Sequence, residues 1–124
     1  MRKLGILNAE LAAAINQLGH TDTFAVADCG LPIPSHVPVI DLALVFGIPR
    51  FSEVLAALRE EVVIQESLVA EESPEEVVAL FNGLPLRKES HEELKALLSD
   101  VKFVVRTGET TAYANVILTS GVAF

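Results

Sequence analysis

The sequence predicts an α/β fold in which helices cover both faces of a central, mixed sheet of about six strands. Short β-prone runs alternate along the chain with amphipathic segments. The 124 residues are 51% hydrophobic, which is enough for one buried core but not for two independent ones. No internal repeat or linker interrupts this pattern. We therefore expect residues 1–124 to form a single three-layer α/β/α domain.

The first third of the chain predicts one helix and two strands. Asn8 is a good N-cap, and the apolar residues after it recur at three- and four-residue spacing, which predicts a helix over 9–18. A β-prone run predicts a strand over 23–27. This strand ends at Asp28, before a loop rich in glycine and proline. A second short strand is expected within 37–44.

The middle of the chain predicts helix, strand and helix. Apolar residues repeat with helical spacing over 51–58, and the apolar run over 62–69 indicates a largely buried strand. The order Ser73-Pro74-Glu75-Glu76 gives a cap, a proline and an acidic first turn. We therefore expect a third helix that starts at Ser73 and ends at Asn82-Gly83.

The last third predicts one helix and three strands. Ser90 and Glu93 have the spacing of a capping box, so a helix opens there with His91 in its first turn. The first of the three strands contains a proline, which favours a place at the edge of the sheet. The strands expected here cover residues 84–88, 101–105 and 113–118.

Composition and charge exclude several classes of function. The net charge is −8, and the nine Lys and Arg residues are not clustered, which argues against nucleic-acid binding. No apolar run approaches the roughly 20 residues of a membrane helix, and the N-terminus turns polar at Asn8, unlike a signal peptide. The mean hydropathy of +0.45 is high, so we expect apolar surface to be buried between copies of the chain. The single Cys29 suits a reducing cytoplasm.

Two residues with acid/base chemistry flank the predicted strand over 23–27. His20 lies just past a helix C-terminus, where the negative end of the helix dipole favours the imidazolium, as a general acid requires. The alternative is a histidine that merely caps the helix carbonyls. Asp28 lies at a strand end, where open α/β sheets place ligand-binding groups. Its alternative role is an Asx turn that starts the following loop.

The second group of candidates lies in the C-terminal third. His91 faces the positive end of a helix, which favours the neutral ring, although an isolated histidine there is also typical of a solvated surface. Tyr113 and Asn115 are two residues apart at the start of a predicted strand, so their side chains share one face and suit a polyol. The alternative is an ordinary polar strand edge. Arg106 and Glu109 fit a loop ion pair.

The remaining reactive side chains give no cofactor signal. Cys29 has no sequence partner that marks a nucleophile, so a small buried filler is favoured. His36 lies in a proline-rich loop and is expected at the surface. Three histidines without a paired ligand motif predict no metal site, and the absence of a glycine-rich phosphate loop gives no support for a nucleotide cofactor.

Four motifs occur in order: KLGILNAELAAAINQLGHTD, ADCGLPIP, SHEEL and RTGETTAYAN. With them, the chain from Lys3 to Phe124 resembles the D-ribose pyranase family, the RbsD branch of the RbsD/FucU sugar mutarotases. The motifs GILN, LGHTD and GLPIP resemble those of the ribose branch more than those of the fucose branch. The resemblance implies a cytoplasmic, ring-shaped homo-oligomer, commonly a decamer of two stacked pentamers, without cofactor or metal.

The resemblance also implies a reaction and its residues. The expected enzyme is an isomerase that interconverts the pyranose and furanose forms of D-ribose and so supports ribose uptake and catabolism. His20 is implied as the proton donor. The residues implied to bind the sugar are Asp28, His91, Tyr113, Ala114 and Asn115. A mutarotase for another sugar, such as L-fucose, and a non-catalytic sugar-binding module are the alternatives.

The chain departs from the family pattern at Cys29, where alanine is frequent, at Ala112, where proline is frequent, and over 71–86, which is short. Strand geometry adds a further expectation. At about 3.3 Å per residue, a straight strand over 23–27 separates His20 from Asp28 by roughly 20 Å or more. A pentose cannot span that distance, so we predict that His20 of one subunit completes the site of its neighbour.

Overall fold

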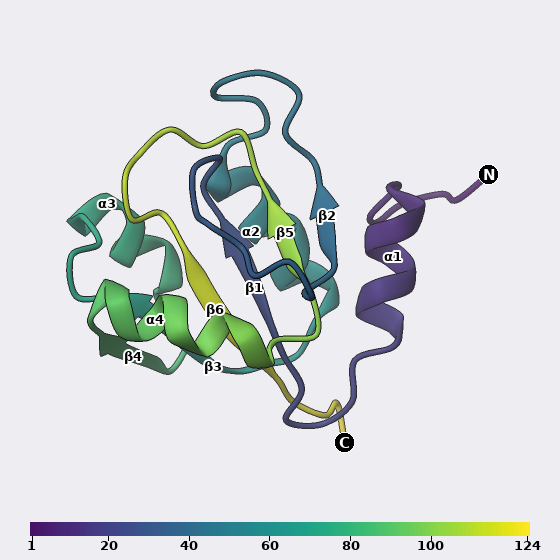
Figure 1. The fold of residues 1–124 in the computed structure, drawn as a ribbon. Coiled ribbons are helices and arrows are strands. Elements are labelled where there is room, and N and C mark those ends of the chain that lie inside the picture. Colours follow the sequence, from purple (N-terminus) through teal and green to yellow (C-terminus); the bar gives the residue numbers. More distant parts are fainter.

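Six strands form one mixed sheet in the computed structural model, which describes all residues 1–124 (Figure 1). The strands are β1 (Thr23–Ala27), β2 (Val39–Asp41), β3 (Ile64–Ala70), β4 (Leu86–Glu89), β5 (Val104–Arg106) and β6 (Val116–Ser120). Their order across the sheet is β2-β5-β1-β6-β3-β4. Only β6 runs antiparallel to its neighbours. The other five strands therefore end at one edge of the sheet, here called the carboxyl edge, and β6 starts there; the opposite edge is the amino edge.

Helices cover both faces of this sheet, as the sequence predicts. They are α1 (Ala9–Asn16), α2 (Phe51–Glu61), α3 (Glu75–Val78) with a 3-10 turn over Ala79–Phe81, and α4 (His91–Leu97) with a 3-10 turn over Leu98–Asp100. One face is buried by a cluster of 17 apolar residues that includes side chains of α1, α2 and α3. The other face is buried by a cluster of 11 that includes side chains of α4 and of the loop after β1. The α/β/α layering is thus confirmed.

The central strand β1 shows how the sheet joins these two clusters. Phe24 and Val26 belong to the larger cluster, whereas Ala25 and Ala27 belong to the smaller one, because side chains alternate along a strand. Phe24 is opposite Leu118 of β6, and its ring stacks on another phenylalanine at a centroid distance of 5.2 Å. Full burial of such a side chain is worth about 1.5–3 kcal/mol. These contacts fix β1 and therefore the positions of the residues at both of its ends.

Several predicted boundaries agree with the structure. The strand over 23–27 has the predicted bounds, and β4 is one of the two outermost strands of the sheet, as the proline in the predicted strand over 84–88 indicates. The Ser90 hydroxyl accepts from the Glu93 N–H at 3.1 Å, although the return bond of a capping box is not formed. The first helix ends at Asn16, two residues early, because the chain turns at once into a loop in which the Gly19 N–H donates to the Asp22 carboxylate at 2.8 Å.

Other predicted boundaries were wrong. The last strand begins at Val116 rather than Tyr113, because Tyr113 has a φ of +64°, a left-handed conformation that no strand accommodates. Residues 62–63 and 101–103 precede their strands, which start at Ile64 and Val104. The third helix is capped at Pro74, not at Ser73. No helix has the length and apolar character needed to cross a membrane.

Candidate active site

A cavity of about 410 Å³ lies at the carboxyl edge, where β1 ends, α4 begins and the loop over 107–115 leads into β6. A cavity of similar size, about 440 Å³, lies between α1 and the β2–β5 side of the sheet, but it contains no histidine. Of these two cavities, only the one at the carboxyl edge therefore contains a histidine, the side chain most often used as an acid or base. Its lining residues are Asp28, Cys29, Gly30, Leu31, Pro32, His91, Glu109, Thr110, Ala112 and Tyr113.

Asp28 is held in this cavity by Asn115. The buried Asn115 amide donates from Nδ2 to Asp28 Oδ2 at 3.1 Å and accepts the Asp28 N–H at 2.8 Å. Asp28 Oδ1 also accepts the Gly30 N–H at 2.9 Å, so the predicted Asx turn is present as well. A carboxylate has about four acceptor positions. The orientation of Asp28 is thus fixed by two donors, while further acceptor positions stay available for a ligand.

His91 and Tyr113 form an aromatic pair on the wall of the same cavity. Their ring centroids lie 5.0 Å apart at an interplanar angle of 80°, an edge-to-face contact. His91 lies in the first turn of α4, as predicted, and is half-buried rather than solvated. Its Nδ1 is buried without a hydrogen-bond partner. An aromatic ring beside polar groups is suited to a sugar, since the ring packs on C–H groups and the polar atoms bind hydroxyls.

Glu109 organises the loop that carries these residues. Its Oε1 accepts the Phe51 N–H at 3.2 Å, and its Oε2 accepts the N–H groups of Thr110 and Thr111 at 3.1 and 3.2 Å. Burial acts to raise the pKa of this carboxyl, but the hydrogen bonds from Thr111, Phe51 and Thr110 outweigh it and lower the pKa below 4.5. Glu109 is therefore a fixed anion in the cavity wall, linking α2 to the loop before β6.

The predicted ion pair between Arg106 and Glu109 is thus wrong. Arg106 instead binds both oxygens of Asp41, at 3.1 and 3.0 Å, and donates to the Cys29 carbonyl at 3.1 Å. Because β2 and β5 are parallel neighbours, Asp41 and Arg106 are in register at the carboxyl edge. Cys29 is half-buried and lines the cavity, so the interpretation as a buried filler is also wrong.

Gly108 allows the cavity wall to pack closely on the loop before α2. The Gly108 N–H donates to the Pro49 carbonyl at 2.8 Å, and the Gly108 carbonyl accepts the Gly47 N–H at 2.6 Å. A Cβ at position 108 would lie 2.5 Å from the Ile48 carbonyl oxygen. Any larger residue would displace this backbone. The adjacent Glu109 carbonyl accepts the Cys29 N–H at 2.9 Å, which ties the wall to the end of β1.

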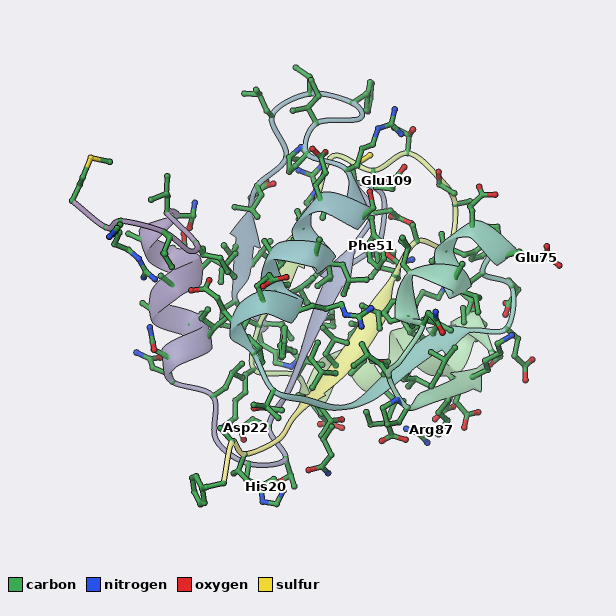
Figure 2. All side chains as sticks on the ribbon, turned by 180° about the vertical axis from the view of Figure 1, so that it is seen from behind. His20, Asp22, Phe51, Glu75, Arg87 and Glu109 are labelled. Carbon is green, nitrogen blue, oxygen red and sulfur yellow. The ribbon has the colours of Figure 1, made fainter.

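His20 lies at the amino edge, away from this cavity. Figure 2 shows it at the far end of the sheet from Glu109. The imidazole is exposed, and its Nε2 lies 2.9 Å from Gln65 Oε1 rather than on the carbonyls of α1. His36 is exposed, as predicted, and its Nε2 lies 3.0 Å from the Ser99 carbonyl oxygen. No group of three or more His, Cys, Asp or Glu residues is placed to hold a metal ion.

The predicted residues thus divide between the two edges. Asp28, His91 and Tyr113 line one cavity. Asn115 is hydrogen-bonded to Asp28, and the neighbouring Ala114 is fully buried. His20 is not brought to them. Glu109 lines the cavity but was not predicted as a site residue. Its contact with Phe51 joins residues 58 positions apart, so no local signal in the sequence marks it.

Comparison with known proteins identifies the family. The model of the RbsD / FucU transport protein family matches residues 1–123. The D-ribose pyranases of Corynebacterium glutamicum (strain R) and Cutibacterium acnes are 60% and 53% identical, and each is covered over its full length and the full length of this chain. A solved structure of Bacillus subtilis RbsD complexed with D-ribose is 44% identical, covers all of both chains and superposes with a TM-score of 0.94. FucU from Bifidobacterium longum, 20% identical over 95% of this chain and 97% of its own, shares the fold with a TM-score of 0.82. The chain therefore belongs to the RbsD / FucU transport protein family.

Proposed function

We propose that this protein is an isomerase that interconverts the pyranose and furanose forms of D-ribose. The observation that carries the proposal is the cavity that brings Asp28, His91 and Tyr113 together in a chain 60% identical to a D-ribose pyranase. The ribose-bound relative from Bacillus subtilis supports a sugar ligand. A fucose mutarotase complexed with L-fucose is only 19% identical to this chain, which supports a common fold and not a common sugar.

The reaction needs only proton transfers. Ring opening removes the proton of the anomeric hydroxyl and adds one to the ring oxygen, and reclosure through O4 in place of O5 reverses these steps. One positioned acid or base contributes about 10² to 10⁴ in rate. Holding the open-chain aldehyde with O4 close to C1 adds a proximity contribution. Asp28, His91, Tyr113 and the backbone around Ala114 hold the sugar, and Asn115 holds it through Asp28.

His20 of a neighbouring subunit supplies the proton. In one chain, all five residues of β1 lie between His20 and Asp28, and the two residues lie at opposite edges of the sheet. At about 3.3 Å per residue the strand alone exceeds the length of a pentose. The His20 ring is exposed and so is available to a second copy of the chain. Each cavity is therefore completed across a subunit interface.

Exposed apolar side chains support this assembly. The loop between β2 and α2 presents Leu44, Val45, Phe46 and Ile48, and Phe46 is 85% exposed. Surface of this kind is typical of protein interfaces. The assembly is a homo-oligomer, and the family resemblance favours a decamer of two pentameric rings. Residues 1–124 act as one domain, and the single Cys29 without a disulfide partner fits the cytoplasm.

Magnetisation exchange between the pyranose and furanose NMR signals of D-ribose at equilibrium tests the function. Accelerated exchange on addition of the protein is the expected result. Binding of ribose with unchanged exchange would instead identify a sugar-binding module. Faster exchange for L-fucose than for D-ribose would identify a mutarotase of the other branch. Failure of every pentose and hexose to bind would contradict the whole interpretation.

A further inference from the structure

Two residues outside the cavity form hydrogen bonds to the backbone of its aromatic pair, His91 and Tyr113. Glu72 and Ser73 lie in the loop between β3 and α3 and do not line the cavity. Both oxygens of the Glu72 carboxylate accept the backbone N–H of His91, at 3.1 and 3.2 Å. The Ser73 hydroxyl donates to the backbone carbonyl of Tyr113 at 2.9 Å. One short loop thus contacts both members of the pair.

The contact of Ser73 is unexpected for its place in the sequence. The motif Ser73-Pro74-Glu75-Glu76 is that of a helix N-cap, yet α3 is capped at Pro74 without a side-chain hydrogen bond. The Ser73 hydroxyl donates to the Tyr113 carbonyl instead. Tyr113 is a non-glycine residue with a φ of +64°. Such a conformation persists only where the surroundings hold it. The residue before Tyr113 is Ala112, which does not restrict its own φ as a proline would. The hydrogen bond from Ser73 therefore stabilises the left-handed conformation of Tyr113, which the residue before it does not restrict.

The contact of Glu72 fixes the backbone from which the His91 ring projects. His91 is the first residue of α4, so its N–H has no acceptor within the helix. Glu72 supplies that acceptor. The ring itself has a buried Nδ1 without a partner, so no hydrogen bond at this atom sets its orientation. The ring position then depends on the edge contact with Tyr113 and on the anchored backbone.

We propose that Glu72 and Ser73 are positioning residues for the sugar site, which hold His91 and Tyr113 at the spacing that binds the sugar ring. This inference rests on the proposed ribose isomerase activity. Neither residue lines the cavity, and the proposed proton donor His20 lies at the other edge of the sheet. Loss of either contact therefore weakens ribose binding more than it slows proton transfer. The expected signature is a raised KM with a nearly unchanged kcat.

The test measures the concentration dependence of ribose exchange in four variants. Ser73→Ala and Glu72→Ala are each expected to raise KM by about three- to tenfold, the range for loss of one hydrogen bond, with kcat within about twofold of wild type. Ser73→Thr keeps the hydroxyl and restores the wild-type KM. Glu71→Ala removes the neighbouring exposed carboxylate, which makes no side-chain hydrogen bond, and leaves both constants unchanged.

A spectroscopic measurement separates positioning from general stability. Because the Tyr113 ring lies 5.0 Å from the His91 ring, its ring current is expected to shift the NMR signals of the His91 ring protons. Ser73→Ala is therefore expected to move these signals while the urea midpoint of unfolding changes little. Wild-type KM and wild-type ring signals in both alanine variants would overturn the proposal, as would an equal effect of Glu71→Ala. If the wild-type protein does not accelerate exchange, the proposed function fails, but the ring signals still decide whether the two residues hold the pair.

Discussion

The two edges of the sheet are built in opposite ways. At the carboxyl edge, Asn115 and Glu109 are buried and bound to the backbone of other elements, since Asn115 accepts the Asp28 N–H and Glu109 accepts the Phe51 N–H at the start of α2. At the amino edge, His20 is exposed (Figure 2), and the hydrogen bond of its ring is to Gln65. The first arrangement suits the groups that we propose to bind the sugar. The second leaves the proposed proton donor accessible, but without a cavity of its own. In the proposed function, binding and proton transfer are therefore divided between two ends of one strand.

The largest effect is expected at the amino edge. His20→Ala removes the proposed proton donor, so exchange should fall by about 10² to 10⁴ toward the rate of free ribose. Ribose affinity, measured by titration, should stay within about threefold of wild type because the carboxyl-edge cavity is untouched. His36→Ala is the matched control, since that histidine is also exposed and contacts a single carbonyl. A large loss of ribose affinity in His20→Ala would show that binding and proton transfer are not divided between the two edges.

The next effect tests the hydrogen bonds that fix Asp28. Asn115→Asp places a carboxylate against Asp28 where the Nδ2 donor lies 3.1 Å from Oδ2 in the native protein. We expect kcat/KM for ribose to fall by about 10- to 100-fold near neutral pH, the range for a hydrogen bond to a charged group. Activity should partly recover as the pH falls, because one of the two carboxyls then takes up a proton and donates. Asn82→Asp, at an exposed position, is the control; an identical pH profile in both variants would refute the interpretation.

Glu109 tests how much its hydrogen bonds at the carboxyl edge contribute to the stability of the fold. Glu109→Gln replaces an anion that accepts three backbone N–H groups, so unfolding by urea should become easier by about 1–3 kcal/mol at neutral pH. Because the pKa of Glu109 is lower in the folded protein than its ordinary 4.5, its contribution is full above that value and is lost as the pH falls through the folded pKa. The difference between wild type and variant should therefore narrow as the pH falls below 4.5. Glu60→Gln, an exposed carboxylate, should show no such difference, and a gap constant with pH would contradict the role of Glu109.

The smallest effect is expected at the exposed side of α4. Glu92 pairs with Lys95 at 2.8 Å, and the hydrogen bond and charge of Lys95 lower the pKa of its carboxyl. The Glu92 side chain is exposed, so Glu92→Gln should leave both the urea midpoint and the ribose KM unchanged within error. A rise in KM as large as that of Glu72→Ala would mean that negative charge near His91, rather than the position of its backbone, determines binding.

Local patterns predicted the elements whose boundaries are set locally. The strand over 23–27 follows from a β-prone run between turn residues, and the start of α4 follows from Ser90 as its cap. They also placed Asp28 at a strand end that opens into a cavity. The layered α/β/α arrangement follows from apolar faces that need cover on both sides of the sheet.

The sequence could not predict features that depend on partners far along the chain. Tyr113 was expected in a strand, but its left-handed turn is held by Ser73, which lies 40 positions away. Glu109 was expected to pair with Arg106, but the fold brings the start of α2 to it and aligns Arg106 with Asp41. In each case the local pattern was compatible with two roles, and tertiary contacts selected one of them.

The most direct test of the divided site is subunit complementation. His20→Ala and Asp28→Ala, each inactive alone, are unfolded together, refolded as a mixture and assayed by ribose exchange. If His20 of one subunit serves the cavity of its neighbour, about a quarter of the sites in mixed oligomers combine both native residues, and activity should return to roughly that fraction of wild type. If the mixture stays as inactive as its components while forming mixed oligomers, His20 and Asp28 do not meet across an interface.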